Sequence, residues 1–328
     1  MKRHILLPLA LLALVASALA QDFRFTSIDF PGAVFTSGRG INNHGDISGS
    51  YRIPGSPRQA MLLKKGKFIP LAPPAPDATF SEATNINDRG DVTGQWADAN
   101  RFFHGFLLSD GALTILDIPG ATDTYALGVN DSGLVAGYWD LLDQNGNTLA
   151  IYGFTWQDGG FIDTQVNFPG AAGSGLFGVN ARGDLSGVWV PDFVSGIEHG
   201  FVCPKSAPCF SYDAPIQEKV PFTDGKEINA HGQVVGINIG DDGIWHSYLM
   251  SRATLGAESQ VFQRANLCAD RGDGRGARLC FTKIDFPGST GTGAFGINSA
   301  GQIVGKYFTA DGLTHGFLAQ PARKGKPQ

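Results

Sequence analysis

One pattern of nine residues organises this chain, and its first copy reads Ile41-Asn42-Asn43-His44-Gly45-Asp46-Ile47-Ser48-Gly49. Each copy has an apolar residue, Asn, two variable residues, Gly, a variable residue, an apolar residue, a small residue and Gly. The other copies contain Asn87, Asn130, Asn180, Asn229 and Asn298, at successive intervals of 45, 43, 50, 49 and 69 residues. Because Asn and Gly tolerate positive φ, each Asn-x-x-Gly predicts a tight turn between two strands.

Two further strands are expected in each copy. The third begins with His in four copies, at His104, His199, His246 and His315, while Tyr152 and Gln59 take this place in the third and first copies. The fourth runs into Asp117-Ile118-Pro119-Gly120 or a variant of it, where Pro cannot donate to a strand ladder and so marks a strand end. Four antiparallel strands every 40 to 50 residues, roughly, is typical of a β-propeller blade, whereas a parallel β-helix needs a shorter repeat.

The N-terminal segment has the sequence of the fourth strand that the last copy of the repeat lacks. The last copy stops after its third strand, at Phe317-Leu318, and the segment Phe25–Gly32 is nearly identical to the fourth-strand segment Phe281–Gly288. The sequence therefore predicts an all-β fold, a six-bladed β-propeller of four-stranded antiparallel blades whose ring is closed by the N-terminal strand. Such closure leaves no exposed sheet edge.

The first 20 residues have the form of a secretory signal peptide. Lys2 and Arg3 precede an apolar run from Ile5 to Leu14, and Ala18-Leu19-Ala20 is a small-x-small cleavage site. We expect a single propeller over residues 21–320, with an insert in the fifth blade at about 251–280, and a basic tail over 321–328. The location expected is secreted, either extracellular or periplasmic.

Net charge and hydropathy limit the classes of binding partner that we expect. No later apolar stretch approaches the roughly 20 residues that a transmembrane helix needs. The formal charge of -5 argues against a nucleic-acid partner, for which a clustered basic surface is expected. We expect a monomer whose partner is an extracellular carbohydrate or protein.

The four cysteines form two close pairs, Cys203 with Cys209 and Cys268 with Cys280. Export favours disulfides, and proximity favours these local pairings, although four cysteines allow three connectivities. A zinc site is the lesser alternative because neither pair has the spacing of a structural zinc knuckle.

The repeat resembles a known family. The apolar-Asn-x-x-Gly-x-apolar-x-Gly stretch followed by His-Gly-Phe is similar to the HAF-type repeat of extracellular bacterial proteins, over nearly the whole chain after residue 20. Gly or Ser stands where that family has Ala, and Asp-Phe-Pro-Gly replaces its usual Leu-Gly-Gly connection. The resemblance implies an exported repeat protein of undefined activity, with no catalytic residue to transfer.

The recurring histidines allow two interpretations. His is the commonest metal ligand, so a ring of His side chains could bind metal ions. A residue repeated in several blades more plausibly serves each blade, for instance by bonding to the backbone of the neighbouring blade. We favour the structural role and expect no metal site.

Aromatic residues recur two positions after the second-strand Gly. They are Tyr51, Trp96, Trp139, Trp189 and Tyr307; Asn238 takes this place in the fifth blade, where Trp245 joins the candidates. Packing between blades is one interpretation, because large rings bury much area. The functional alternative is a platform on which sugars or peptides stack.

Carboxylates mark the loops between the second and third strands. The candidates are Asp98, Asp143, Asp192, Asp242 and Asp311, with Asp140 and Asp241 nearby. A face edged with them could hold Ca²⁺ or hydrogen-bond a polyol. Asp is also a common turn residue, which explains the same pattern without a site.

The insert carries the adhesive tripeptide Arg-Gly-Asp at Arg271–Asp273, but the same tripeptide recurs in ordinary turns at Arg89–Asp91 and Arg182–Asp184. The chain has no nucleophile elbow, His-Glu-x-x-His or phosphate loop. The function predicted is therefore binding of a carbohydrate or protein. The alternatives are an enzyme acting on extracellular polysaccharide or esters, with Asp143, Asp192 and Asp242 over a central channel, and a structural protein of the envelope or matrix.

Overall fold

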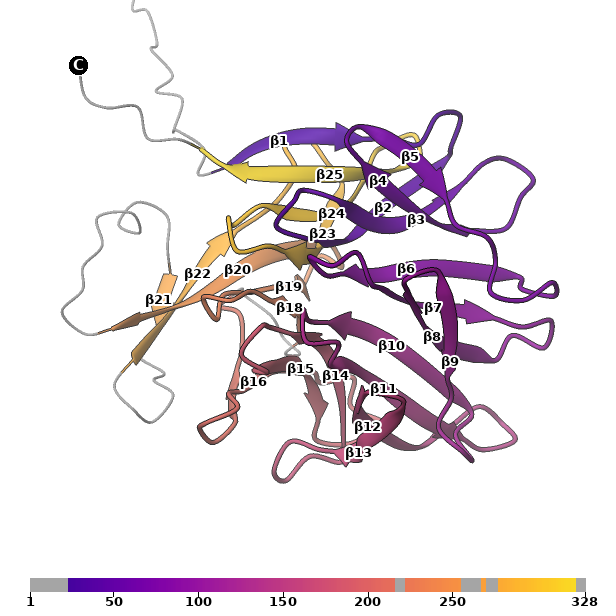
Figure 1. Cartoon of the computed structure of the whole chain (residues 1–328). Helices are drawn as coiled ribbons and strands as arrows, with labels where there is room; N and C mark the ends of the chain where they lie inside the picture. Colours follow the sequence, from indigo (N-terminus) through magenta and orange to yellow (C-terminus); the bar gives the residue numbers. More distant parts are fainter. Residues whose placement is uncertain (1–22, 216–221, 255–266, 270–276, 323–328) are drawn as a thin grey trace, which may run out of the picture.

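The computed structural model describes residues 23–215, 222–254, 267–269 and 277–322 (Figure 1). Throughout these residues the regular structure is β-strand, and no helix there has the length and hydropathy that crossing a bilayer requires. The signal peptide, the Arg-Gly-Asp segment of the insert and the end of the basic tail, all expected from the sequence, lie outside the described residues.

Three sheets contain four strands each, paired antiparallel in chain order. The first has β6 (Phe80–Ile86), β7 (Val92–Ala97), β8 (Phe103–Ser109) and β9 (Ala112–Leu116). The second has β10 (Asp123–Val129), β11 (Val135–Leu142), β12 (Thr148–Gln157) and β13 (Gly160–Val166). The third has β14 (Gly173–Val179), β15 (Leu185–Val190), β16 (His199–Cys203) and β17 (Phe210–Tyr212).

A fourth sheet has five strands. They are β18 (Thr223–Ile228), β19 (Val234–Ile239), β20 (Trp245–Thr254), β22 (Ala277–Lys283) and β21 (Leu267–Ala269), in that order across the sheet. The short strand β21 belongs to the insert and pairs with the outer side of β22. The insert therefore adds a strand beyond the four that the repeat predicts.

The remaining eight strands form one sheet with two antiparallel halves. One half has β2 (Phe35–Ile41), β3 (Ile47–Arg52), β4 (Gln59–Lys64) and β5 (Lys67–Pro70); the other has β23 (Gly291–Ile297), β24 (Ile303–Phe308), β25 (Thr314–Pro321) and β1 (Phe23–Ile28). A single parallel pair, Phe35 with Thr314, joins the halves. The N-terminal strand β1 lies beside β25, with Phe23 opposite Pro321 and Ile28 opposite Gly316 (Figure 1).

The Asn-x-x-Gly turns explain why Asn recurs. In the first, the side-chain oxygen of Asn42 accepts the backbone N–H groups of His44 and Asp46, at 3.1 and 2.9 Å, and Gly45 has a φ of +81°. The Asn42 amide then donates to the backbone oxygen of Asn87, at 3.0 Å.

The same amide contact repeats from each turn to the next. The donors that follow are Asn87, Asn130, Asn180, Asn229 and Asn298, with distances of 2.9 to 3.1 Å, and the last of them donates back to the backbone oxygen of Asn42. Six buried amides thus form a closed cycle of hydrogen bonds between turns that are far apart in the sequence.

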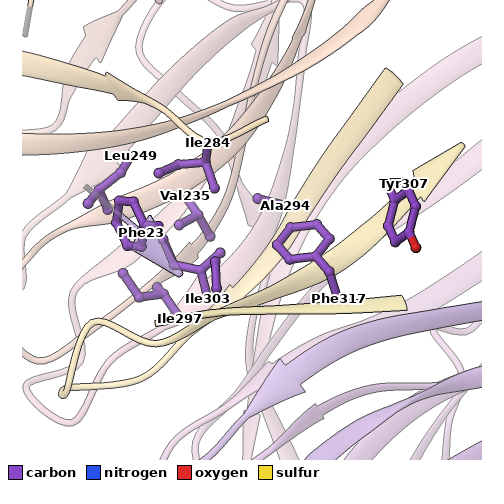
Figure 2. Packing of buried hydrophobic residues seen from close by; sticks show 10 residues of the cluster. Phe23, Val235, Leu249, Ile284, Ala294, Ile297, Ile303, Tyr307 and Phe317 are labelled. Carbon is purple, nitrogen blue, oxygen red and sulfur yellow. The ribbon is translucent and has the colours of Figure 1, made fainter. Parts of the chain in front are cut away.

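Apolar clusters fill the space between successive sheets. Figure 2 shows one of them, in which Val235 and Leu249 of the five-stranded sheet face Ile303 and Phe317 of β24 and β25. Phe23 of β1 belongs to the same cluster and is only 8% exposed. The N-terminal strand is therefore held by core packing as well as by its ladder with β25.

Candidate functional site

Several of the recurring aromatic rings pack inside the molecule. Trp96, Trp189 and Tyr307 each lie opposite the first His of the third strand and stack on it, with ring centroids 4.5, 4.4 and 5.1 Å apart. Tyr51, Trp96 and Tyr307 are only 6 to 8% exposed. These three rings offer little surface on which a ligand could stack.

The other members of the aromatic set differ in exposure. Trp139 is half-buried and donates its indole N–H to the backbone oxygen of Thr164, at 2.6 Å. Asn238 is fully buried opposite His246. Trp245 is half-buried at the start of β20, where its ring meets Phe308 edge-on at 5.8 Å.

Each recurring His is bonded to a carboxylate at the end of the fourth strand. The Nδ1 atoms of His104, His199 and His246 lie 2.9, 2.6 and 2.7 Å from carboxylate oxygens of Asp117, Asp213 and Asp285. His315 makes the same contact, at 2.8 Å, with Asp29 of the N-terminal segment. The hydrogen-bond partner of each of these histidines is thus an Asp side chain, whereas the sequence favoured the backbone of a neighbouring blade.

The carboxylates in the loops between the second and third strands accept hydrogen bonds from their own loops. Asp143 accepts the backbone N–H groups of Asn145 and Asn147, both at 2.8 Å, and Asp192 accepts those of Val194 and Ser195, at 2.8 and 2.6 Å. Asp98, Asp242 and Asp311 make similar contacts with Phe102, Ile244 and Leu313. The side-chain amide of Asn147 and the backbone N–H groups of Asn147 and Asn145 hold the pKa of Asp143 below its usual value, and the N–H groups of Ser195 and Val194 do the same for Asp192.

The loop carboxylates do not gather into a metal-binding group in the part of the chain that the structure describes. Among the described residues, no group of three or more His, Cys, Asp or Glu side chains is placed to hold a metal ion. Asp140 differs from the others, because burial and the nearby Asp123 raise its pKa to about 7.

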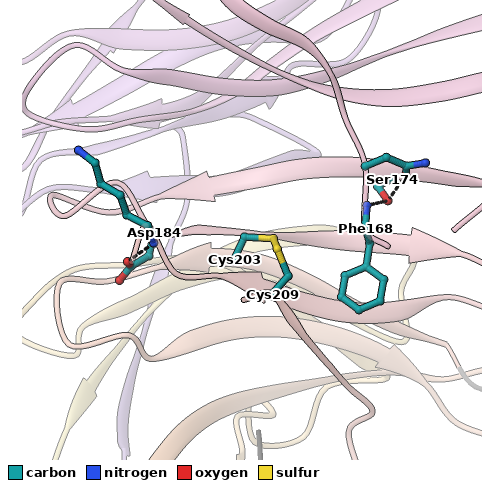
Figure 3. The surroundings of a disulfide bond; sticks show 7 residues. Phe168, Ser174, Asp184, Cys203 and Cys209 are labelled. Carbon is teal, nitrogen blue, oxygen red and sulfur yellow. Dashed lines mark hydrogen bonds between the residues drawn. A yellow bond between two sulfur atoms is a disulfide. The ribbon is translucent and has the colours of Figure 1, made fainter. Parts of the chain in front are cut away.

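One predicted disulfide is present. Cys203 at the end of β16 is bonded to Cys209, just before β17, and the bond closes the loop between these strands (Figure 3). In the second pair, the backbone of β21 places Cys268 directly opposite Cys280, whereas the side chain of Cys268 is outside the described residues.

A cavity of about 300 Å³ lies between the β14–β17 sheet and β22. It is lined by Trp189, His199, Ser211, Tyr212, Asp213, Leu279 and Phe281. Its volume is at the lower end of the range typical of small-molecule sites, roughly 300 to 1,000 Å³. Among the aromatic candidates from the sequence, only Trp189 is part of this lining.

The lining has a polar side and an apolar side. His199 is bonded through Nδ1 to Asp213, and the indole N–H of Trp189 donates to the Ser211 hydroxyl at 2.8 Å. Leu279 and Phe281 come from the neighbouring sheet and are largely buried. The Trp189 ring is already stacked on His199 and on Phe168, with centroids 4.4 and 5.1 Å apart. It therefore forms part of the cavity wall and does not offer a free face on which a ligand could stack.

The cavity residues that the sequence analysis missed lie on β17, directly after it, and on β22. Asp213-Ala214-Pro215 is a divergent copy of the Asp-apolar-Pro motif, and an alignment of all fourth strands would have placed Asp213 beside His199. Leu279 and Phe281 carry no such signal, because their approach to the cavity depends on how two sheets pack.

A second, smaller cavity of about 80 Å³ lies at the Asn turns. Asn85 and Glu227 are part of its lining, and the amide of Asn85 donates to the carboxyl of Glu227. Burial raises the pKa of Glu227 to about 8. This carboxyl group is therefore mostly protonated at neutral pH.

Comparison with known proteins gives information on the fold and none on the function. No family model and no curated protein matches the sequence. A protein of unknown function from Dyadobacter fermentans DSM 18053 superposes with a TM-score of 0.52 at 10% identity, over 92% of this chain and 100% of that one. The chain thus shares its all-β fold with that protein over nearly its whole length.

Two other solved structures are less similar. The β-propeller domain of the Trilobed protease from Pyrococcus furiosus has a TM-score of 0.42 at 11% identity, over 89% of this chain and 100% of that one. An arginine-to-alanine triple mutant of AofleA from Arthrobotrys oligospora has a TM-score of 0.39 at 12% identity, over 91% and 77%.

Proposed function

We propose that the chain is an exported six-bladed β-propeller that binds a carbohydrate in the cavity between the β14–β17 sheet and β22. The six-bladed arrangement is supported by the cycle of Asn amide bonds and by the contacts between first strands, which run from β2 through β6, β10, β14, β18 and β23 back to β2. Pairing of β1 with β25 supports closure of the ring by the N-terminal strand.

Export is supported by the form of the first 20 residues and by the Cys203–Cys209 disulfide, which is typical of oxidising compartments. The resemblance to HAF-type repeats agrees with an extracellular or periplasmic location, and it belongs to the same proposal.

The observation that carries the ligand class is the two-sided lining of the cavity. A sugar ring presents hydroxyl groups at its edge and C–H groups on its faces. The His199–Asp213 pair and Ser211 can exchange hydrogen bonds with hydroxyls, and Tyr212, Leu279 and Phe281 can cover the C–H face. The volume suits a single sugar residue.

The test is saturation-transfer NMR of the purified protein with a panel of neutral methyl glycosides. We expect one class of glycoside to bind, and Asp213→Asn to weaken its binding about tenfold or more by removing a charged acceptor. Asp117→Asn is the matched control, because it changes the equivalent His–Asp pair of another sheet, outside the cavity.

Comparable binding by wild type and D213N, with both proteins folded, would place the ligand elsewhere. An absence of binding across the whole panel would refute the carbohydrate proposal.

A further inference from the structure

Three cations gather around one buried carboxylate at the junction of three successive four-stranded units. Arg39 lies on β2, Arg58 precedes β4, Lys306 lies on β24 and Glu82 lies on β6. Arg39 Nε is 3.2 Å from one carboxylate oxygen of Glu82, and Arg58 Nη1 is 3.8 Å from the other. We call Arg39, Arg58 and Lys306 the cation cluster.

Two aromatic rings hold the cation cluster together. The Arg58 guanidinium lies 4.0 Å from the ring centroid of Phe35, and the Arg39 guanidinium lies 4.1 Å from that of Phe295. The Lys306 ammonium is 5.8 and 5.6 Å from the same two centroids. The Lys306 ammonium therefore lies near both of the rings on which the two guanidinium groups stack.

The positive charge of the cluster exceeds the negative charge beside it. Burial opposes ionisation of Glu82, but Arg39, Arg58 and a hydrogen bond from Ser50 hold its pKa below the usual value, so it supplies one negative charge. The nearby Lys226 is paired with Asp224, at 2.5 Å, and that carboxylate does not serve the cluster.

The cation cluster also has hydrogen-bond donors without a protein partner among the described residues. Within the described residues, the Lys306 ammonium makes no hydrogen bond or ion pair, and its contacts are with aromatic rings. The side chains of Arg39 and Arg58 remain 18% and 32% exposed, so a small solute can reach them. Like charges held this close and partly desolvated repel one another unless an anion joins them.

We propose that the cation cluster is a binding site for an oxyanion, either a free ion or the acidic group of a larger ligand. Arg offers a planar fork of donors to such a group and Lys offers a compact charge. The stacking of both guanidinium groups on aromatic rings orders them before binding, which lowers the entropic cost of binding. This site is separate from the proposed carbohydrate cavity, and neither depends on the other.

Trp245 provides a built-in reporter, because its ring centroid is 5.0 Å from the Lys306 ammonium. The full-length exported protein is titrated with sodium sulfate, and separately with sodium acetate, against sodium chloride at equal ionic strength. We expect a saturable change in tryptophan fluorescence that is absent in Trp245→Phe. A preference for sulfate or for acetate identifies a tetrahedral or a planar acidic group as the preferred ligand.

Lys306→Met should weaken binding at least about tenfold, since it removes one charge-assisted contact while keeping the length of the side chain. Lys67→Met is the matched control, because Lys67 is exposed on β5 and makes the same change of charge. Arg58→Gln is a second variant, should K306M not fold. The proposal fails if the signal follows ionic strength alone, or if both folded variants bind as tightly as wild type.

Discussion

At the scale of single residues, Asn85 and Glu227 break the internal repetition of the chain. The equivalent positions of the other four units are Gly40, Gly128, Gly178 and Gly296. Glycine is needed there because a Cβ at Gly40 would lie 2.7 Å from Asn85 Cα, and one at Gly296 would lie 2.9 Å from Gly40 Cα. The first strands approach closely at this level, and the two side chains that do occur meet each other.

The raised pKa of Glu227 makes stability depend on pH. Its folded value is about 8, because of burial, against an ordinary value of 4.5. The folded state therefore holds a proton that the unfolded state releases, so the free energy of unfolding falls as the pH rises from about 4.5 to about 8. Glu227→Gln keeps a partner for Asn85 and should be more stable than wild type at pH 9, by about 2 to 5 kcal/mol.

Urea unfolding of both proteins from pH 4 to pH 9 measures this difference. Burial also raises the pKa values of Asp140 and Glu198 to about 7. These two groups change the free energy of unfolding with pH equally in wild type and E227Q, so their contribution cancels when the two proteins are compared. Parallel stability curves for wild type and E227Q would contradict the assignment.

At the scale of elements, a Ser or Thr near the start of most first strands accepts a hydrogen bond from the connecting segment before it. Thr36, Thr124 and Thr292 each accept a backbone N–H from the segment after the preceding fourth strand, at 2.9 to 3.1 Å. The contact of Thr36 is with Phe30, which follows β1. The N-terminal strand is thus connected to its neighbour in the same way as β9 and β22, whereas Ser81 at the start of β6 accepts the backbone N–H of Ala60 on β4 instead.

Removal of residues 21–32 should therefore destroy the native fold. The deletion exposes the edge of β25, takes Phe23 and Ile28 from the core and leaves His315 without Asp29. We expect no cooperative thermal transition by circular dichroism, and rapid proteolysis.

A synthetic peptide of residues 21–32 is the matching control, because its addition in trans should restore part of the transition. A truncated protein that melts at the wild-type temperature would show that β1 is dispensable.

At the scale of the whole molecule, the proposed ring has no unique starting point other than the break between β1 and β25. Phe23 and Pro321 are opposite each other in the ladder, so a linker of a few residues can join these ends. New termini fit between β5 and β6, where residues 73–77 are partly or fully exposed. A circular permutant of this design keeps every strand pair.

We expect this permutant to keep the near-ultraviolet circular dichroism spectrum of wild type and to melt within about 5 °C of it, because closure by a hairpin replaces closure by separate strands. A second permutant with its new termini inside β7 is the control and should fail to fold. If the first permutant is unfolded, the β1–β25 pairing is not equivalent to the pairings inside the other units.

The sequence by itself determined the strands of the repeat and their antiparallel order, but not the extra strand β21 of the insert. Each Asn-x-x-Gly turn depends on local conformational preferences, and the likeness between Phe25–Gly32 and Phe281–Gly288 identified the partner of β25. It also located Trp189 and His199, because residues that recur at fixed spacing occupy equivalent positions.

Only the tertiary structure decided which of these residues meet. Leu279 and Phe281 reach the cavity of Trp189 from another sheet, and Asn85 meets Glu227, which is 142 positions away in the sequence. The tertiary structure also showed that Asp143 and Asp192 serve their own loops. Turns and repeats are encoded in neighbouring residues, whereas a site made between sheets depends on packing among all of them, which no local pattern records.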